Sequence, residues 1–141
     1  MKRLLLVGGV GCGKTTLLQR LEGRDISYAK TGEMYASGGV IDTPGEYLEL
    51  PWFKHALRLA SFEVELVVLI ASATVPEGRF QPGFTTFFMP PCIGVVTKVD
   101  IATPEQVQLA GNHLRLAGAT EILAVSALTG VGMAELTARL A

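Results

Sequence analysis

The sequence predicts a three-layer α/β domain in which a mostly parallel, six-stranded sheet carries helices on both faces. Short apolar runs alternate with stretches of helical spacing along the chain, as in strands that are joined by crossover helices. Two of these runs, 66–71 and 92–96, are apolar almost throughout, which is typical of strands buried on both faces. A glycine-rich turn separates the first apolar run from the first helical stretch. For a chain of 141 residues we expect one domain over 1–141.

Local patterns predict the elements of the first half of the chain. The first apolar run predicts a strand over 3–8, and the stretch after the glycine-rich turn predicts a helix over 14–22. A Gly-Gly pair between the short segments 33–37 and 40–42 predicts a small hairpin. A second helix is expected over 52–61, because apolar residues recur there at helical spacing, at Phe53, Ala56, Leu57 and Ala60.

The second half begins with the strand 66–71 and continues into a less regular part. Residues 75–91 are rich in proline and glycine and contain four phenylalanines. After the strand 92–96, Thr103 is a favourable N-cap, followed directly by proline, for a helix that ends near Gly118. A last short strand is expected over 122–125, and a C-terminal helix over 133–140 is expected to pack on the sheet.

Composition excludes several classes of protein. Apolar residues make up 49% of the chain and charged residues 18%, which is typical of a globular protein and not of a disordered one. The formal net charge is −1 and there is no basic run, so we expect no nucleic-acid partner. The two cysteines, Cys12 and Cys92, lie in different elements without metal-ligand spacing, which indicates a reducing cytoplasm and no disulfide.

The apolar runs are also too short for a membrane segment. Lys2-Arg3 and the run 4–7 resemble the start of a signal peptide, but the glycine-rich turn interrupts that run after four residues. The run 66–71 is far shorter than a membrane span. We therefore expect a cytoplasmic protein with no membrane partner.

The glycine-rich turn has the spacing of a phosphate-binding loop. Residues 8–15 read G-G-V-G-C-G-K-T, which matches G-x-x-x-x-G-K-[ST] between a strand and a helix. Backbone N–H groups of such a loop and the start of the helix form an anion nest, the lysine reaches the β- and γ-phosphates, and the Thr15 hydroxyl ligates Mg²⁺. The sequence thus predicts a P-loop NTPase domain whose phosphate contacts are Gly8, Gly9, Val10, Gly11, Cys12, Gly13, Lys14, Thr15 and Thr16.

A second motif follows the strand 40–42. The segment Asp42-Thr43-Pro44-Gly45 has the form D-x-x-G. A carboxylate at a strand end beside a phosphate loop holds Mg²⁺ through water, and the glycine amide contacts a γ-phosphate. We expect Asp42 to serve the metal and Gly45 the reacting phosphate.

Two further motifs predict recognition of guanine. Thr97-Lys98-Val99-Asp100 follows the strand 92–96, and the Asp100 carboxylate has the geometry to accept hydrogen bonds from the N1–H and N2–H₂ groups of guanine. Adenine lacks this donor pair, so binding it would leave a buried carboxylate unpaired, at a cost of about 1–3 kcal/mol or more. The Lys98 stem is expected to lie along the base. After the last strand comes the short motif Ser126-Ala127-Leu128, whose Ala127 amide is placed for the guanine O6 atom.

The ordered set of four motifs resembles the translation-factor-related class of small GTPases. A closer resemblance, to the EutP/PduV family, is carried by residues 41–47 (I-D-T-P-G-E-Y), 82–84 (P-G-F) and 93–98 (I-G-V-V-T-K). Members of that family are GTPase-like proteins encoded with bacterial ethanolamine- and propanediol-utilisation systems. The resemblance implies GTP or GDP with Mg²⁺ as ligands, association with a bacterial microcompartment, and shell or pathway enzymes as partners.

The chain departs from the pattern of such GTPases at three points that bear on activity. Thr97, where an asparagine is also common, has no amide and is expected to tie the loops less well. The segment before Asp42 is short, so that Thr31 is the best candidate for the Mg²⁺-binding switch threonine. Glu46 replaces a water-positioning glutamine, and its carboxylate is repelled by a γ-phosphate unless it is protonated or turned away. With Lys14, Gly45, Glu46 and Thr31 as the catalytic set, we expect slow hydrolysis of GTP.

Two other functions remain open on the sequence. A phosphotransferase giving the γ-phosphate to a small carboxylate, such as an acetate kinase, would use the same loop and metal. A non-enzymatic docking module that binds nucleotide is favoured by Glu46 and by the aromatic stretch 80–88. The helical spacing of Phe84, Phe87 and Phe88 nevertheless favours a place in the core over a partner site.

Overall fold

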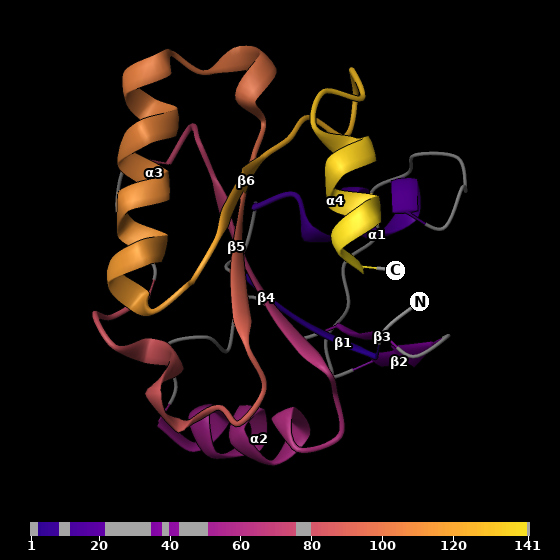
Figure 1. Cartoon of the computed structure of the whole chain (residues 1–141), viewed down its shortest axis with the longest axis vertical. Helices are drawn as coiled ribbons and strands as arrows, with labels where there is room; N and C mark the ends of the chain where they lie inside the picture. The colour runs from indigo at the N-terminus through magenta and orange to yellow at the C-terminus, as the bar shows by residue number, and fades with distance from the viewer. Residues whose placement is uncertain are drawn as a thin grey trace.

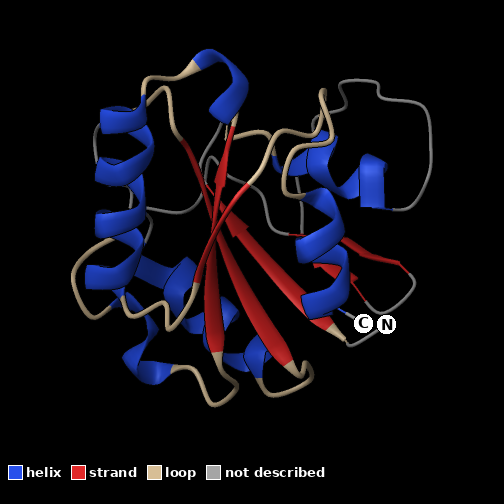
Figure 2. Ribbon diagram, turned by 45° about the horizontal axis from the view of Figure 1, so that its top comes forward, coloured by secondary structure: helices blue, strands red, loops and turns tan. Residues whose placement is uncertain are grey.

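The structure is a computed structural model, and it describes residues 3–8, 12–21, 35–37, 40–42, 51–75 and 80–140. Its sheet has the strand order β2-β3-β1-β4-β5-β6 (Figures 1 and 2). All neighbours pair in parallel except β2 and β3, which form the predicted antiparallel hairpin. The predicted fold class is therefore confirmed. The strands are β1 (Leu4–Gly8), β2 (Tyr35–Ser37), β3 (Val40–Asp42), β4 (Leu66–Ser72), β5 (Cys92–Thr97) and β6 (Ile122–Ala124).

Helices cover both faces of this sheet. α1 (Lys14–Leu21) and α4 (Met133–Leu140) lie on one face, and α2 (Pro51–Ser61) and α3 (Pro104–Ala117) serve the other (Figure 1). Each face has its own apolar core, because successive side chains of a strand point to opposite sides. This explains why the central runs are apolar without alternation. No helix among the described residues has the length and apolar character that a membrane span requires.

The predicted capping signals of α3 are present. The Thr103 hydroxyl accepts a hydrogen bond from the Gln106 amide at 3.2 Å, and the Gln106 side chain accepts one from the Thr103 amide at 2.9 Å. This capping box satisfies two backbone groups at the start of the helix. Gly118 ends the helix with φ 119°, and a Cβ there would overlap the hydroxyl of Thr85. The end of α3 is thereby held against the segment between β4 and β5.

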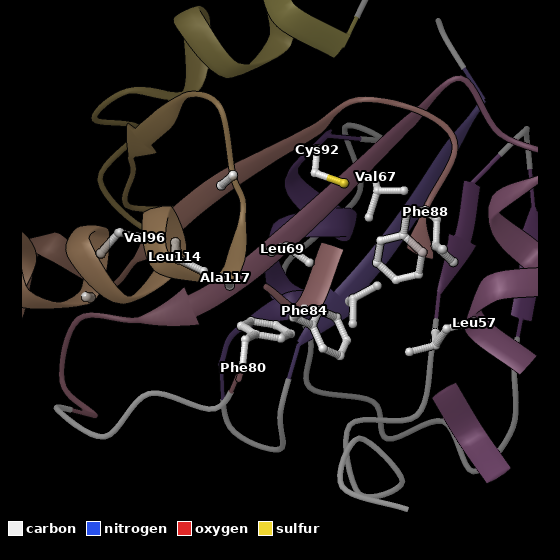
Figure 3. Packing of buried hydrophobic residues seen from close by; sticks show 14 of the residues in the cluster. Leu57, Val67, Leu69, Phe80, Phe84, Phe88, Cys92, Val96, Leu114 and Ala117 are labelled. Carbon is white, nitrogen blue, oxygen red and sulfur yellow. The ribbon is translucent and has the colours of Figure 1, made fainter. Parts of the chain in front are cut away.

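The segment between β4 and β5 packs aromatic side chains on the same face of the sheet as α2 and α3. Its described part contains one short 3-10 helix, η2 (Phe84–Phe87). Phe80 and Phe84 have ring centroids 5.0 Å apart, and Phe84 meets Phe88 edge to face at 5.6 Å. Figure 3 shows these three rings between Leu57 of α2 and the α3 side chains. All three are buried, so the core assignment of Phe84 and Phe88 is confirmed, whereas the Phe87 side chain lies outside the described set.

The strand order places a topological switch point between β1 and β4. The chain passes from β1 to β3 on one side of β1 and then returns to β4 on the other side. Connections therefore leave the β1–β4 pair in opposite directions, and ligands of open α/β sheets bind at the carboxyl ends of the strands at such a point. The phosphate-loop sequence directly follows β1 at this edge.

Removing the central ring of the aromatic group should strongly destabilise the fold. Phe84→Ala leaves a cavity among Phe80, Phe88 and the sheet, and we expect the free energy of unfolding to fall by about 3–5 kcal/mol. Urea unfolding at constant temperature measures the loss. Met89→Ala is the matched control, since Met89 is 76% exposed and its loss should change stability by no more than about 0.5 kcal/mol. Equal effects of the two substitutions would contradict the packing role of Phe84.

Candidate functional site

The predicted motifs meet at the carboxyl edge of the sheet. The strand register pairs Gly8 with Ile70, Ser72 with Thr97, and Val96 with Ala124. The loops that follow β4, β5 and β6 therefore leave the sheet at the same level, at the upper end of these strands in Figure 1. Strand pairing therefore brings the ends of segments that are far apart in the sequence to one edge of the sheet.

The described part of the phosphate loop is consistent with an anion site. Gly13 has φ 88°, a left-handed conformation that favours glycine, and its carbonyl accepts the first helical hydrogen bond from the Leu17 amide at 2.9 Å. Lys14 is the first residue of α1 and is only 7% exposed. A buried ammonium at a helix start is unusual, and it adds a positive charge where backbone N–H groups already favour anions. Gly9, Val10 and Gly11 lie outside the described residues, as does the Thr15 side chain.

The hydroxyl of Thr97 ties the phosphate loop to the end of the sheet. Its Oγ1 atom lies 2.5 Å from the Cys12 carbonyl oxygen and 3.3 Å from the Ala71 carbonyl oxygen. One hydroxyl proton is thus shared between two acceptors, one in the loop after β1 and one in β4. Thr97 itself is 4% exposed. The hydroxyl therefore reaches both neighbours directly, and the expectation that it ties the loops less well than an asparagine stays a prediction.

Lys98 continues this contact toward the phosphate loop. A Cβ built on Gly13 would lie 3.6 Å from Thr97 Oγ1 and 3.7 Å from Lys98 Cε. The lysine stem therefore passes directly over the loop backbone. Among the described residues other than glycine, Lys98 alone has a positive φ, at 61°. The left-handed conformation costs a non-glycine residue about 1–2 kcal/mol, and such strain is concentrated at functional sites.

Asp100 follows in a short 3-10 helix, η3 (Val99–Ile101), and is exposed. The Val99 amide donates to the Val125 carbonyl at 3.4 Å, which joins η3 to the loop after β6. The carboxylate is accordingly presented to solvent beside that loop. The penalty for an unpaired Asp100 therefore applies only when a bound base covers it.

The loop after β6 is closed by Ser126. Its buried hydroxyl accepts from the Thr129 amide at 3.2 Å, and its carbonyl accepts from the Gly130 amide at 2.9 Å. The Ser126 amide donates to the Val131 carbonyl at 2.9 Å. Within the part of the chain that the structure describes, the Ala127 amide makes no such bond, and Leu128 is 68% exposed. Among the described residues, the turn thus leaves the Ala127 amide without an acceptor beside η3, as it does the neighbouring Leu128 amide.

A contact between two hydroxyl groups at the end of β4 could not be predicted from the sequence. Ser72 is buried, and its Oγ lies 2.7 Å from Thr74 Oγ1. The Ala73 amide donates to the Thr97 carbonyl at 2.9 Å, which fixes this turn beside the end of β5. The apolar pattern of β4 gives no signal for this contact, because it depends on the register between β4 and β5.

Several predicted site residues cannot be placed against these loops. Asp42 ends β3 and pairs with Leu6 of β1, so its backbone lies one strand away from the phosphate loop, but its side chain is not described. Thr31, Gly45 and Glu46 lie outside the described residues, and their assigned roles stay predictions. Across the described ranges from 3 to 140, no group of three His, Cys, Asp or Glu side chains has the arrangement of a metal site.

Comparison with known proteins gives a family match over the whole chain. The PduV-EutP family model, described as ethanolamine utilisation and propanediol utilisation, matches residues 1–141. The chain is 40% identical over 136 residues to the propanediol utilization protein PduV of Citrobacter freundii, covering 96% of this chain and 91% of that protein. It is 37% identical over 103 residues to the probable acetate kinase EutP of Escherichia coli strain K12, covering 72% of this chain and 65% of that protein.

Solved structures share the fold at lower identity. A probable GTP-binding protein engB superimposes with a TM-score of 0.74 at 21% identity, covering 96% of this chain and 94% of that one. A bacterial selenocysteine-specific elongation factor EF-Sec gives a TM-score of 0.71 at 22% identity, covering 99% of this chain and 29% of that one. Both likenesses concern the fold.

The hydroxyl group of Thr97 should contribute measurably to the free energy of unfolding. Thr97→Val keeps the branched shape and removes the donor to the Cys12 and Ala71 carbonyls, so we expect the free energy of unfolding to fall by about 1–3 kcal/mol. Amide hydrogen exchange in residues 12–21 should quicken in the same variant. Thr97→Ser keeps the hydroxyl and serves as the control. A Val variant as stable and as protected as the wild type would show that the bridge is dispensable.

Proposed function

The chain belongs to the PduV-EutP family, and we propose that it is a Mg²⁺-dependent guanine-nucleotide-binding protein that slowly hydrolyses GTP. One observation carries this proposal. The Thr97 hydroxyl and the Lys98 stem lie directly against the phosphate loop at Cys12 and Gly13. A motif that reads the base of a nucleotide must lie close enough to the phosphate-binding loop for one nucleotide to reach both. The contacts of Thr97 and Lys98 with that loop support such a placement for the motif 97–100.

The phosphates would be held by the loop after β1 and by Lys14. Burial of this ammonium beside backbone N–H groups strengthens its attraction for a polyphosphate, because the local dielectric constant is low. Mg²⁺ prefers hard oxygen ligands and usually keeps several waters. The hydroxyls of Thr15 and Thr31, with Asp42 through water, would supply oxygen ligands of this kind. The ion would neutralise charge on the β- and γ-phosphates.

The base would lie between η3 and the loop after β6. The exposed Asp100 carboxylate would accept from the N1–H and N2–H₂ groups of guanine, and the Ala127 amide would donate to O6. The hydrogen bond from Val99 to Val125 supports this pairing, because it holds the two recognition loops together. Ser126 and Leu128 flank that amide, and Lys98 would cover one face of the base.

Hydrolysis would proceed by in-line attack of water on the γ-phosphorus. Positioning and charge neutralisation account for most catalysis of phosphoryl transfer, so the phosphate loop, the metal and the Gly45 amide would do most of the work. Glu46 would stand where the attacking water is oriented, and its negative charge would repel the γ-phosphate. This is the physical reason for proposing a slow reaction.

A second candidate function is phosphotransfer to a small carboxylate. The specific observation in its favour is the similarity to proteins titled probable acetate kinase. In that reaction a carboxylate oxygen attacks the γ-phosphorus, the bond to the β–γ bridging oxygen breaks, and an acyl phosphate and a nucleoside diphosphate result. Incubation with GTP or ATP and acetate, followed by hydroxylamine trapping, separates the two reactions: hydroxamate indicates transfer, and free phosphate alone indicates hydrolysis.

The cellular setting is proposed from the family alone. The family description names ethanolamine and propanediol utilisation, and a cytoplasmic place is consistent with it. Association with a microcompartment shell or with pathway enzymes would follow from the family resemblance and is part of the proposal. The docking module without turnover remains the third possibility. It requires tight nucleotide binding with phosphate release no faster than the background rate.

Asp100 should decide the choice of base. Asp100→Asn is expected to weaken GTP binding and to favour xanthosine triphosphate, whose C2 carbonyl replaces the amino donor of guanine. Loss of the pair of charge-assisted bonds should reduce GTP affinity by about 10–100-fold. Isothermal titration of GTP, GDP, ATP and xanthosine triphosphate, with and without Mg²⁺, measures the change. Unchanged GTP affinity in the variant would overturn the base-reading role.

Glu46 should limit the rate of the intrinsic reaction. We expect turnover near the unassisted Ras-like rate of about 10⁻⁴–10⁻³ s⁻¹. Glu46→Gln removes the negative charge and keeps the shape, so it should bind GTP more tightly and hydrolyse it at least as fast. Phosphate release under single-turnover conditions gives both rates. A slower variant would instead identify Glu46 as a general base, and turnover of several per second in the wild type would refute the slow reaction.

A further inference from the structure

A buried serine at the end of β4 takes no part in the proposed nucleotide contacts. Ser72 is the last residue of β4 and is 3% exposed. It follows six apolar residues of a central strand, and a hydroxyl group that leaves water for such surroundings is costly unless it is hydrogen-bonded. Buried polar side chains therefore have partners in almost every case. The partners of Ser72 indicate what it does at this position.

Both hydrogen-bonding functions of the Ser72 hydroxyl are used within one turn. Its Oγ atom accepts from the Thr74 amide at 3.2 Å and lies 2.7 Å from Thr74 Oγ1. Among the described residues, neither hydroxyl group has a further partner. If Thr74 donated in this contact, the proton of buried Ser72 would have no acceptor, whereas Thr74 is half-buried and its proton can reach water. Ser72 is accordingly the donor and Thr74 the acceptor.

This turn is joined to the residue that contacts the phosphate loop. The Val75 amide donates to the Ser72 carbonyl at 3.2 Å, which encloses Ala73 in the turn. The Ala73 amide donates to the Thr97 carbonyl at 2.9 Å. Ser72 and Thr97 are also register partners in β4 and β5, and paired residues of neighbouring strands point to the same face of a sheet. The hydroxyl contact thus lies directly beside Thr97.

We propose that Ser72 and Thr74 are positioning residues for the nucleotide site and act through Thr97. Their hydroxyl contact fixes the turn, and the turn fixes the Thr97 carbonyl. The Thr97 side chain then meets the Cys12 carbonyl of the phosphate loop, and the base-reading motif continues from Lys98. Without the hydroxyl contact, nucleotide binding would itself have to order these loops, which lowers affinity. This inference rests on the proposed binding of guanine nucleotide.

Ser72→Ala tests the proposal, and Ser61→Ala is the matched control. Ser61 is also a buried serine, at 1% exposure, and its hydroxyl donates to the Arg58 carbonyl at 2.6 Å at the end of α2, away from the carboxyl edge of the sheet (Figure 1). Both variants lose the hydrogen bond of a buried hydroxyl, so both should lower the midpoint of urea unfolding. Only Ser72→Ala should also weaken the binding of GDP and GTP, by about 5–10-fold in isothermal titration with Mg²⁺.

Thr74 offers a second pair of variants. Thr74→Val keeps the shape of the side chain and removes the acceptor of the Ser72 proton, whereas Thr74→Ser keeps that acceptor. The valine variant should bind GTP about as weakly as Ser72→Ala, and the serine variant should match the wild type. The double variant Ser72→Ala/Thr74→Val should bind no more weakly than either single one, because the two residues act as a unit.

Equal nucleotide affinity of Ser72→Ala and Ser61→Ala overturns the proposal, and so does wild-type affinity in Thr74→Val. Amide hydrogen exchange of the nucleotide-free proteins separates this failure from a failure of the proposed function. Exchange in residues 12–21 should quicken in Ser72→Ala and not in Ser61→Ala, and unchanged exchange in Ser72→Ala overturns the positioning role. A wild type that binds no guanine nucleotide refutes the proposed function, while the exchange result still decides whether Ser72 positions the phosphate loop.

Discussion

The contact of the Thr97 hydroxyl with the Cys12 and Ala71 carbonyls is the interaction on which the site depends. Three strands end at this edge, and their pairing alone would leave the loops beyond them independent. The hydroxyl joins the loop after β1 to the ends of β4 and β5 in one buried position. An unpaired buried polar group is costly, so the three segments are held in one arrangement. The next residue, Lys98, lies close to Gly13. Its left-handed backbone, at φ 61°, forms the N-cap of η3.

Close approach of the backbones explains why so short a side chain is sufficient for this contact. A hydroxyl reaches only one bond beyond Cβ, and it therefore bridges two carbonyls only where the backbones themselves lie close together. The parallel register of β4 and β5 brings Ser72 beside Thr97, and Gly13 supplies the left-handed turn, at φ 88°, that follows the Cys12 carbonyl. A longer amide would span a wider gap. In this chain a small donor makes the contact across closely spaced backbones. The positions of the loops therefore depend on how the central strands pack.

Local sequence predicted most of the fold because most of it is encoded locally. The Thr103 cap, the apolar runs of β4 and β5, and α4 all depend on residues within one turn or one strand. The site was predictable as a set of motifs, but the contact that joins them was not, because Thr97 and Cys12 are 85 residues apart. The helical spacing of Phe84 and Phe88 predicted their place in the core, but the exposure of Asp100 depends on tertiary packing that the motif does not encode.

The aromatic filling between β4 and β5 also accounts for the unusual face of α2. In an ordinary amphipathic helix the large apolar side chains point inward and the small or polar ones outward. Here Phe80, Phe84 and Phe88 occupy the space on the sheet, so the described inner face of α2 needs only Leu57 beside small residues such as Ala60 and Ser61. Among the described side chains of α2, the large apolar ones Trp52 and Leu59 are exposed. The three rings thus fill this face of the sheet from one segment, where a crossover helix would otherwise supply the apolar side chains.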